Sequence, residues 1–504
     1  MPNRSLLSFL GLSFTLFLTC EVGLAQDDLD SLDAWVRDMH PDPFIRCGEQ
    51  AWLEALDETR EVWIGASPSE HVRQVNALLQ VLRDSHTAVS TSDWIWDVEW
   101  QHGTVPVRWA IEGRALWVLD SGVPDLPEEV RVLKLNGLDA EDVVDAAMDL
   151  STMEGDSWGA TSRTAAHNVT SWVLGSTARD TLEMTWVDPS SGLATSGVFP
   201  TVPWRKARGA WASISTRRPV VDWTFPDGSH LTKSDNRRAA REDARLAESG
   251  RSRRITTHWK GAATLKITSF SAGSWRRYHT RLNRGFAELK NQGCPLVLDL
   301  RSNPGGQSPR MEALWRHLAA ERRHLPYALV AKQSPVTARA NGKHYRRLKK
   351  RWVDKHRETS SDAQYIYTMA TLPLGSTDTL WFPKQGVRRD GFRGPLAVLM
   401  DGESASAAVS FAGAVQESGR GLLVGEACLG PSNGTMGNPY FRVLPLSGIA
   451  VSISTAVYMA KPCEDWGATL PVQADLQVPA MWRRDSGLND VLNAWITSNQ
   501  RGTP

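Results

Sequence analysis

The chain contains few cysteines and none of the common metal or phosphate motifs. Five cysteines occur among 504 residues, and their spacing is not that of a zinc site. The twelve histidines are dispersed, and the sequence has no HExxH, no CxxC and no glycine-rich phosphate loop. We therefore expect neither a metal ion nor a cofactor.

An excess of charge of one sign is also missing. Lysine and arginine together number 57, against 56 aspartates and glutamates. No global field would attract nucleic acid, so we expect no nucleic-acid partner. A helix that spans a membrane needs roughly 20 apolar residues, and the apolar run from Leu6 to Leu18 is shorter. We therefore expect no stable membrane anchor.

The N-terminus has the pattern of a secretory signal peptide. Arg4 precedes the apolar run, and Gly23-Leu24-Ala25 is a small-x-small cleavage site. Residues 1–25 are therefore expected to direct export to the periplasm or the outside of the cell. Cys20 offers an alternative, a lipoprotein, but Phe17 and Thr19 fit a lipobox poorly.

Four cysteines would remain after this cleavage. In an oxidising compartment they could form up to two disulfides, with three possible connectivities. The sequence does not choose between them, although the C-terminal pair Cys428 and Cys463 is favoured by position. The four residues are Cys47, Cys294, Cys428 and Cys463.

The hydrophobic pattern changes along the chain and predicts several domains. Helical spacing comes first, then short alternating strands with turns at Glu112-Gly113 and Asn136-Gly137, then an arginine-rich stretch. From Ala262 onward strands alternate with helices, which predicts an α/β core with a largely parallel sheet. The expected segments are 1–25 (signal peptide), 26–95 (helical), 96–205 (strand-rich module), 206–260 (exposed insertion), 261–485 (core) and 486–504 (C-terminal tail or helix).

Two motifs in the predicted core indicate acyl-transfer chemistry. The stretch 296–306, LVLDLRSNPGG, is a buried strand that runs into a glycine turn. About a hundred residues later, DGESASAA at 401–408 places serines at the start of a helix. A hydroxyl there lies beside unpaired backbone N–H groups and the positive end of the helix dipole. Such groups can stabilise an oxyanion.

This pair of motifs resembles the S41 serine peptidases, the family of C-terminal processing, tail-specific and tricorn-type proteases. The resemblance implies a multidomain α/β fold: an N-terminal helical segment, a PDZ-like α+β module and a ClpP/crotonase-like peptidase core. It also implies a peptide or unfolded-protein substrate. The loop of the middle module that would bind a peptide carboxylate is not evident in the sequence. The oligomeric state is not predicted.

Three serines compete for the role of nucleophile, Ser404, Ser406 and Ser410. The family pattern, a serine flanked by alanines with a second serine two residues earlier, falls on Ser406. The expected oxyanion donors are the N–H of Ala407 and the backbone of Gly305 or Gly306, because glycine lets the chain approach closely. A helix N-cap would be the structural explanation of these serines.

A serine nucleophile needs a base. The tail-specific branch uses a lysine, but Pro431 stands at that position and no lysine lies between Ser406 and Lys461. The tricorn-type branch uses a histidine preceded by serine, which matches Ser85-His86. Its near-neutral pKa suits a general base.

The resemblance places the carboxylate that orients this histidine at Glu464, with the adjacent Asp465 as the alternative. Asp299 and Arg301 are interpreted as a structural pair that shapes the glycine turn, and Asp84 as a local structural residue. The alternatives are an inactive relative that binds peptides or small ligands, and an esterase. An ordinary lipase-like elbow is disfavoured because GxSxG is absent at Ser406.

Overall fold

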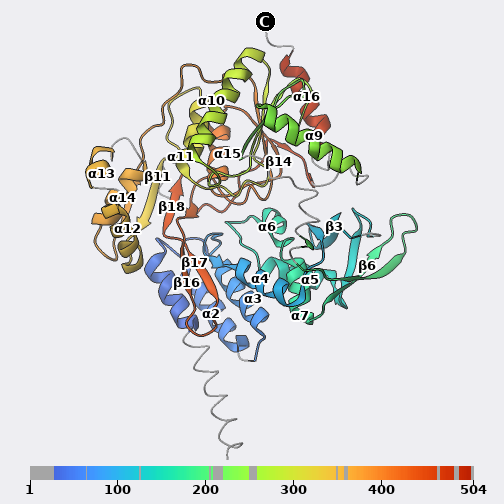
Figure 1. The fold of residues 1–504 in the computed structure, drawn as a ribbon. Coiled ribbons are helices and arrows are strands. Elements are labelled where there is room, and N and C mark those ends of the chain that lie inside the picture. The colour runs from blue at the N-terminus through green and yellow to red at the C-terminus, as the bar shows by residue number, and fades with distance from the viewer. Residues whose placement is uncertain are drawn as a thin grey trace, which may run out of the picture.

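The computed structural model describes residues 28–500. Gaps fall at 64, 124–125, 204–205, 208–219, 249–257, 348–349, 357–360, 462–465 and 482–486. The core forms the upper part of Figure 1, and the N-terminal helices and the middle module lie beneath it. The expected signal peptide and the pair Glu464 and Asp465 lie outside the described residues.

The N-terminal segment is helical, as expected. A helix over 28–39 buries Leu29, Leu32 and Val36 at helical spacing, and they pack with Trp52 of α2. Ser67 caps α3 by accepting a hydrogen bond from the N–H of Glu70. The following helices are α2 (Glu49–Trp63), α3 (Pro68–Gln80) and α4 (Thr91–His102).

The middle module is an antiparallel sheet in the order β2-β3-β4-β6-β7, with β5 paired to β4. The two predicted turns are present, and Asn136 and Gly137 both have positive φ, as a tight hairpin turn requires. Three helices belong to this module. Its elements are β2 (Val107–Glu112), β3 (Ala115–Ser121), β4 (Arg131–Leu135), β5 (Leu138–Asp139), α5 (Ala140–Asp149), α6 (Trp158–Ala165), α7 (Val169–Thr177), β6 (Thr181–Val187) and β7 (Ala194–Pro200).

The core contains the predicted parallel sheet. Its order is β19-β14-β13-β10-β9-β8, and every neighbouring pair is parallel except β8 with β9. The strands are β8 (Val221–Thr224), β9 (Ala263–Ile267), β10 (Leu296–Asp299), β13 (Leu396–Met400), β14 (Leu422–Gly425) and β19 (Leu476–Gln477). The central strands are buried on both faces, which explains their continuous apolar runs.

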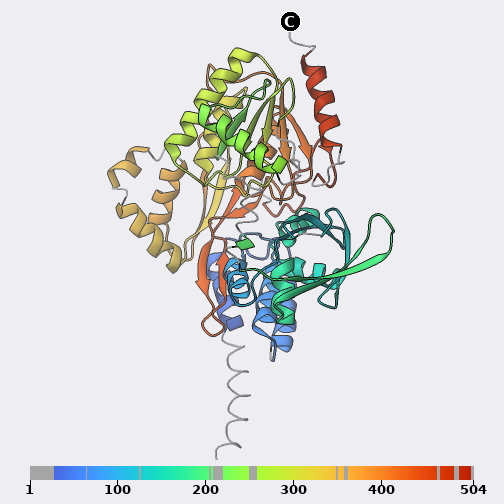
Figure 2. The same cartoon turned by 45° about the vertical axis from the view of Figure 1, so that its right-hand side comes forward.

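Helices cover both faces of this sheet (Figure 2). On one face Leu298 of β10 belongs to the cluster that contains residues of α10, α11 and α15, and on the other Val297 packs with Leu492 of α16. The chain is thus a multidomain α/β protein. These helices are α10 (Trp275–Gln292), α11 (Ser308–Leu318), α15 (Ala407–Glu417) and α16 (Leu488–Gln500).

One expected segment has a different structure. The segment 206–260 is not wholly an exposed insertion, because β8 is buried and forms an edge of the core sheet, followed by α9 (Lys233–Glu248). Trp223 of β8 lies where a Cβ on Gly285 would meet its indole ring at 2.1 Å, so only glycine allows α10 to pack there. At the C-terminus, where a tail or helix was expected, the helix α16 packs on the core.

Two smaller sheets complete the core. One has the antiparallel order β12-β11-β18-β15, and its strands are β11 (Ala328–Lys332), β12 (Thr377–Trp381), β15 (Thr435–Gly437) and β18 (Ala456–Met459). The basic stretch near it is helical: α12 (Pro335–Arg347), α13 (Lys350–His356) and α14 (Ser361–Thr371). The other has the order β1-β17-β16: β1 (Ala88–Val89), β16 (Tyr440–Val443) and β17 (Ala450–Ile453).

Cys47, Cys294 and Cys428 are free thiols, and Cys463 lies outside the described residues. The disulfide connectivity therefore stays open. Within the described ranges, no helix combines the length and the apolar character needed to cross a membrane.

Asp299 and Arg301 form the expected structural pair. The carboxylate of Asp299 is fully buried, accepts hydrogen bonds from the Arg301 guanidinium and lies 3.2 Å from Lys266 Nζ. These cations outweigh the cost of burying the carboxylate and hold its pKa well below the ordinary value. The pair fixes the chain just before the glycine turn.

We expect Asp299→Ala to lower the free energy of unfolding by about 3–5 kcal/mol, because it leaves a buried guanidinium without its partner. Urea denaturation followed by circular dichroism measures this loss. Asp390→Ala is the matched control, because that carboxylate pairs with Arg388 on the surface. Equal stability of the two variants would contradict a structural role for Asp299.

Candidate active site

Ser406 occupies a strained position directly before α15. Its φ of 53° and ψ of −119° lie outside the regions that residues with a side chain normally adopt. Strain of this kind persists only where neighbouring structure imposes it, and it gathers at functional sites. Here the N–H of Ala405 donates to the carbonyl of Asn303 at 3.0 Å, which ties the serine loop to the glycine turn.

The other two serines have different surroundings. Ser404 is fully buried, donates from Oγ to the carbonyl of Leu300 at 3.0 Å and accepts the N–H of Asp401 at 3.0 Å. Ser404 is therefore a structural residue of the loop. Ser410 lies one helical turn beyond Ser406 and contributes to the wall of the same cavity. Of the three, only Ser406 stands at the junction of loop and helix.

The glycine turn presses against this serine. A Cβ on Gly305 would lie 2.6 Å from the carbonyl oxygen of Ala405 and 2.7 Å from the Cβ of Ser406. At Gly306 it would meet Ser271 Oγ at 2.2 Å. Both glycines have positive φ, 87° and 134°. The two positions therefore need glycine for conformation and for space.

The backbone donors near Ser406 can be distinguished by their existing bonds. The N–H of Gly305 donates to Oδ1 of Asn303 at 2.9 Å, so it is already engaged. The N–H groups of Gly306 and Ala407 have no hydrogen-bond acceptor within the described ranges, and both residues line the cavity. Of the three expected donors, these two remain available to an oxyanion.

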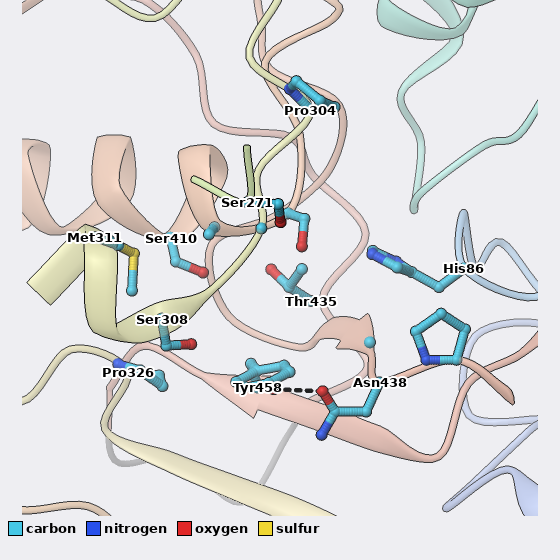
Figure 3. A pocket seen from close by; sticks show the side chains of 15 residues that line it. His86, Ser271, Pro304, Ser308, Met311, Pro326, Ser410, Thr435, Asn438 and Tyr458 are labelled. Carbon is cyan, nitrogen blue, oxygen red and sulfur yellow. Dashed lines mark hydrogen bonds between the residues drawn. The ribbon is translucent and has the colours of Figure 1, made fainter. Parts of the chain in front are cut away.

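His86 and Ser406 line one cavity of about 310 Å³. Figure 3 shows the imidazole pointing into this space from the N-terminal segment, opposite the side chains of the core. Its Nε2 atom has no hydrogen-bond partner among the residues that the structure describes. Hydrogen bonds of a catalytic site are often long or poorly aligned before substrate binds. A direct bond between His86 and Ser406 is therefore not required in this state.

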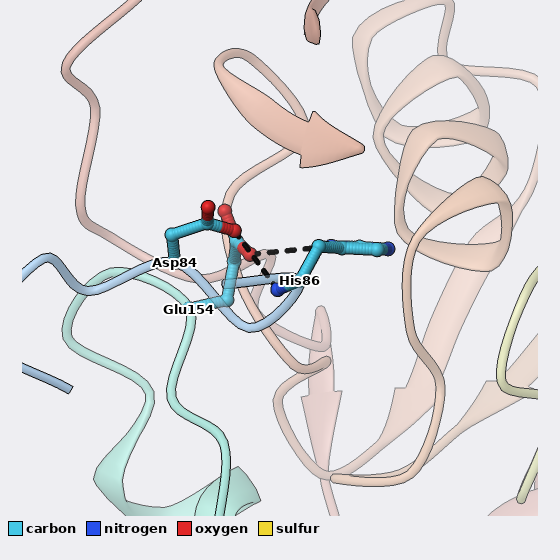
Figure 4. Close-up of side chains that lie close together, drawn as sticks. All are labelled: Asp84, His86 and Glu154. Atoms are coloured by element: carbon cyan, nitrogen blue, oxygen red, sulfur yellow. Dashed lines mark hydrogen bonds and ion pairs between the residues drawn. The ribbon is translucent and has the colours of Figure 1, made fainter. Parts of the chain in front are cut away.

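A carboxylate lies behind the imidazole, and it is Glu154 (Figure 4). Its Oε2 lies 3.8 Å from His86 Nδ1 and accepts the hydroxyl of Ser85 at 2.7 Å. Ser85 Oγ is also 3.3 Å from Nδ1. The expected help from Ser85 therefore has a geometric basis, since its hydroxyl bridges the carboxylate and the imidazole.

Glu154 is held in place by a buried cation. Its Oε1 accepts a 2.8 Å hydrogen bond from Arg46, whose other terminal nitrogen donates to the carbonyl of Gly434 at 2.6 Å. Both side chains are essentially inaccessible to solvent. The ion pair thus connects the helical segment, the middle module and the core directly behind the imidazole.

These charges set the pKa values of the site. Burial disfavours the protonated imidazole, but the nearby carboxylates of Glu154 and Asp84 outweigh this effect, so the pKa of His86 is raised. Burial would raise the pKa of Glu154, yet the charge of Arg46 and the adjacent His86 lower it. The carboxylate is therefore ionised wherever the imidazole titrates.

Asp84 supports the histidine through the backbone, in keeping with the expected local role. Its buried carboxylate accepts the N–H of His86 at 2.9 Å and bonds His40 and Thr87. Asp84, His86 and Glu154 offer ligand atoms within 4.8 Å of one another. Since His40 and Arg46 already engage the two carboxylates, the cluster fits the orientation of an imidazole better than a metal ion.

The structure locates most of the predicted site residues. It brings Ser85, His86, Ser406, Gly306 and Ala407 to one region. No lysine lines the cavity within the described part of the chain, and the backbone of Lys461 bonds Asn433 away from it. Glu464 stays a prediction, because it lies outside the described residues.

Sequence reasoning missed Glu154 and Arg46. Glu154 stands in a loop of the middle module, in the run STMEGDS, and Arg46 stands in a turn between two helices. Neither position belongs to a motif. Glu154 and Arg46 are 108 residues apart in the chain, and they become partners only when three segments of the chain meet.

The core also resembles a known protein family in its sequence. Residues 261–476 match the profile described as Peptidase family S41. The core of this chain is therefore similar to peptidase family S41. A comparison with curated protein sequences gave no significant match.

Solved structures resemble the whole chain, beyond its S41 core. The structure of mature CPAF complexed with lactacystin is 13% identical, with a TM-score of 0.62 over 95% of this chain and 98% of that chain. The crystal structure of mature CPAF is 14% identical, with a TM-score of 0.59 over 96% and 99% of the two chains. At these identities the likeness establishes the fold alone. The domains that flank the S41 core therefore belong to a shared architecture.

We expect Gly305→Ala to destabilise the protein more than Gly448→Ala. Both glycines have positive φ, but a Cβ at Gly448 would have open space around it. The conformational strain costs about 1–2 kcal/mol at either position, and the collision with the serine loop adds about 1–3 kcal/mol at Gly305. Urea denaturation measures both values. The same loss in the two variants would show that the close approach to Ser406 is not rigid.

Proposed function

We propose that this chain is an exported serine peptidase in which Ser406 is the nucleophile and His86 the general base. The observation that carries the proposal is the shared cavity, where a strained serine at a helix N-terminus faces an imidazole backed by a buried, ionised carboxylate. The family of the core supports a peptidase.

In this mechanism Nε2 of His86 takes the proton of the Ser406 hydroxyl as Oγ attacks the carbonyl carbon of a peptide bond. The N–H groups of Gly306 and Ala407 stabilise the oxyanion. The imidazolium then returns its proton to the leaving amine, and the acyl-enzyme forms. Water, deprotonated by the same imidazole, hydrolyses the ester and regenerates the hydroxyl.

Glu154 and Ser85 are positioning residues in this proposal. A negative charge near Nδ1 keeps the proton on that nitrogen and leaves Nε2 free to accept one. It also stabilises the imidazolium formed during attack. Glu464 remains the family-based prediction for this role, and substitution can distinguish the two acids.

Fluorophosphonate labelling of the purified mature protein tests the nucleophile and the base. We expect the wild type to react, and Ser406→Ala and His86→Ala to lose labelling, with at least about a 10⁴-fold loss of peptide turnover. Ser404→Ala is not a neutral control because it is buried, so Ser308→Ala on the cavity wall serves instead. A well-folded wild type that never labels would favour the inactive ligand-binding relative.

The pH dependence of the labelling rate tests Glu154. The neutral imidazole is the active form, and its pKa is raised, so the rate should rise with pH around a midpoint above the ordinary histidine value. Glu154→Gln removes the charge that stabilises the imidazolium, so the midpoint should move to lower pH while the plateau falls.

Glu464→Gln is the matched comparison for this experiment. If Glu154 orients the imidazole, Glu464→Gln should leave the midpoint near that of the wild type. A shift in Glu464→Gln without one in Glu154→Gln would assign the role to Glu464. Thermal melting of both variants checks that each is folded.

A further inference from the structure

Strand β16 forms an outer edge of the sheet that follows the cavity. The order is β1-β17-β16, so β17 pairs with β16 on one side and with β1 on the other. Pro439 and Asn438, directly before β16, line the cavity that contains His86 and Ser406, and Figure 3 shows Asn438 there. The hairpin of β16 and β17 then runs from the core alongside the N-terminal helices (Figure 1). The edge therefore starts at the catalytic cavity.

The backbone groups on this edge can be assigned from the ladder. The N–H of Leu444 donates to the carbonyl of Ile449 at 2.9 Å, so this pair is bonded across β16 and β17. The carbonyl of Ala450 instead accepts the N–H of Ser90, which lies on the β1 side. Antiparallel pairs alternate between bonded and non-bonded positions. Val443, opposite Ala450, and Phe441, two residues earlier, therefore direct their N–H and C=O groups outward. Among the described residues, neither makes a backbone hydrogen bond to a residue outside this sheet.

The same two residues expose apolar side chains. Phe441 is 69% and Val443 is 60% exposed, and they share one face of the strand. The opposite face is anchored, because the Arg442 guanidinium lies 4.5 Å from the centre of the Trp35 ring. An exposed edge with apolar side chains is a ready template for another strand.

The hairpin is held rigidly. The carboxylate of Asp28 accepts the N–H groups of Leu446 and Ser447 at 2.9 and 2.8 Å, which fixes the turn to the first described helix. Ser452 Oγ on β17 donates to the carbonyl of His86 at 2.8 Å. The outer edge thus keeps a fixed position relative to the proposed base.

We propose that an extended peptide substrate leaves the catalytic cavity along β16 and adds to this sheet as a further strand. This inference rests on the proposed function and concerns the substrate of the same site. Main-chain hydrogen bonds to Phe441 and Val443 would hold any unfolded sequence. Apolar side chains at alternate positions would pack beside the two exposed ones.

The length of the edge makes the proposal quantitative. Four strand residues span about 13 Å, so a peptide must continue about four residues beyond the cavity to use them. Binding should therefore depend on peptide length, with apolar residues favoured at alternate positions.

The test uses the mature chain carrying Ser406→Ala, so that bound peptide is not cleaved. Fluorescein-labelled peptides of four and eight residues, with valine at alternate positions, are titrated by fluorescence polarisation. Two eight-residue peptides are used, and they extend a common four-residue sequence at its N-terminal or its C-terminal end. We expect one eight-residue peptide to bind at least about tenfold more tightly, as two backbone hydrogen bonds predict. Phe441→Pro with Val443→Pro should abolish this advantage.

Proline is suited to these positions because each N–H points away from β17, so its loss leaves the internal ladder intact. Val443→Thr keeps the N–H and should keep the length advantage. Thermal melting establishes that each variant is folded. Equal affinity for short and long peptides in the parent, or an advantage that survives both prolines, would overturn the proposal.

Sedimentation velocity tests whether a second copy of the chain occupies this edge instead of a peptide. A parent dimer that the two prolines convert to a monomer would assign the edge to a second copy of the chain and overturn the proposal. Fluorophosphonate labelling of the chain with Ser406 intact distinguishes a failure of the strand addition from a failure of the proposed catalytic function. Length-dependent binding without labelling supports the added strand and overturns only the catalytic function.

Discussion

The ion pair between Arg46 and Glu154 is the interaction on which the proposed site depends. It is buried, and it joins three parts of the chain at the point where the imidazole is held. A buried pair is costly to form, and much more costly to leave half-formed. Misplacement of any of the three parts would leave an unpaired charge in the interior, so correct assembly and correct orientation of His86 are enforced by the same contact.

A second constraint acts on the serine. The backbone at Ser406 is strained, and it is held by the glycine turn on one side and by the start of α15 on the other. Ser404 and Asn303 also fix the loop, because their side chains form hydrogen bonds with backbone atoms of Leu300 and Gly305. The position of Ser406 therefore depends on polar residues whose structural role is not evident from their polarity alone.

The sequence predicted the parts of the molecule that short-range pattern determines. The parallel strands, the helices that follow them and the position of Ser406 all depend on local runs of residues. The strand Val221–Thr224 was missed because arginine-rich neighbours dominate the composition, while its buried contacts come from Gly285, far along the chain. Glu154 was missed for the same reason: its partners are Arg46 and His86, and nothing near it in sequence indicates them.

The division of the site between distant segments has a consequence for how the protein is made. His86 and Ser406 are 406 − 86 = 320 residues apart, and the strand that pairs with β1, Ala450–Ile453, comes later still. A chain emerging from a ribosome or a translocation channel therefore carries the proposed base long before it carries the proposed nucleophile. The cavity can close only when nearly all of the polypeptide has been delivered to the same compartment. A peptidase of the proposed kind is thus kept inert while it is itself unfolded and beside other nascent chains.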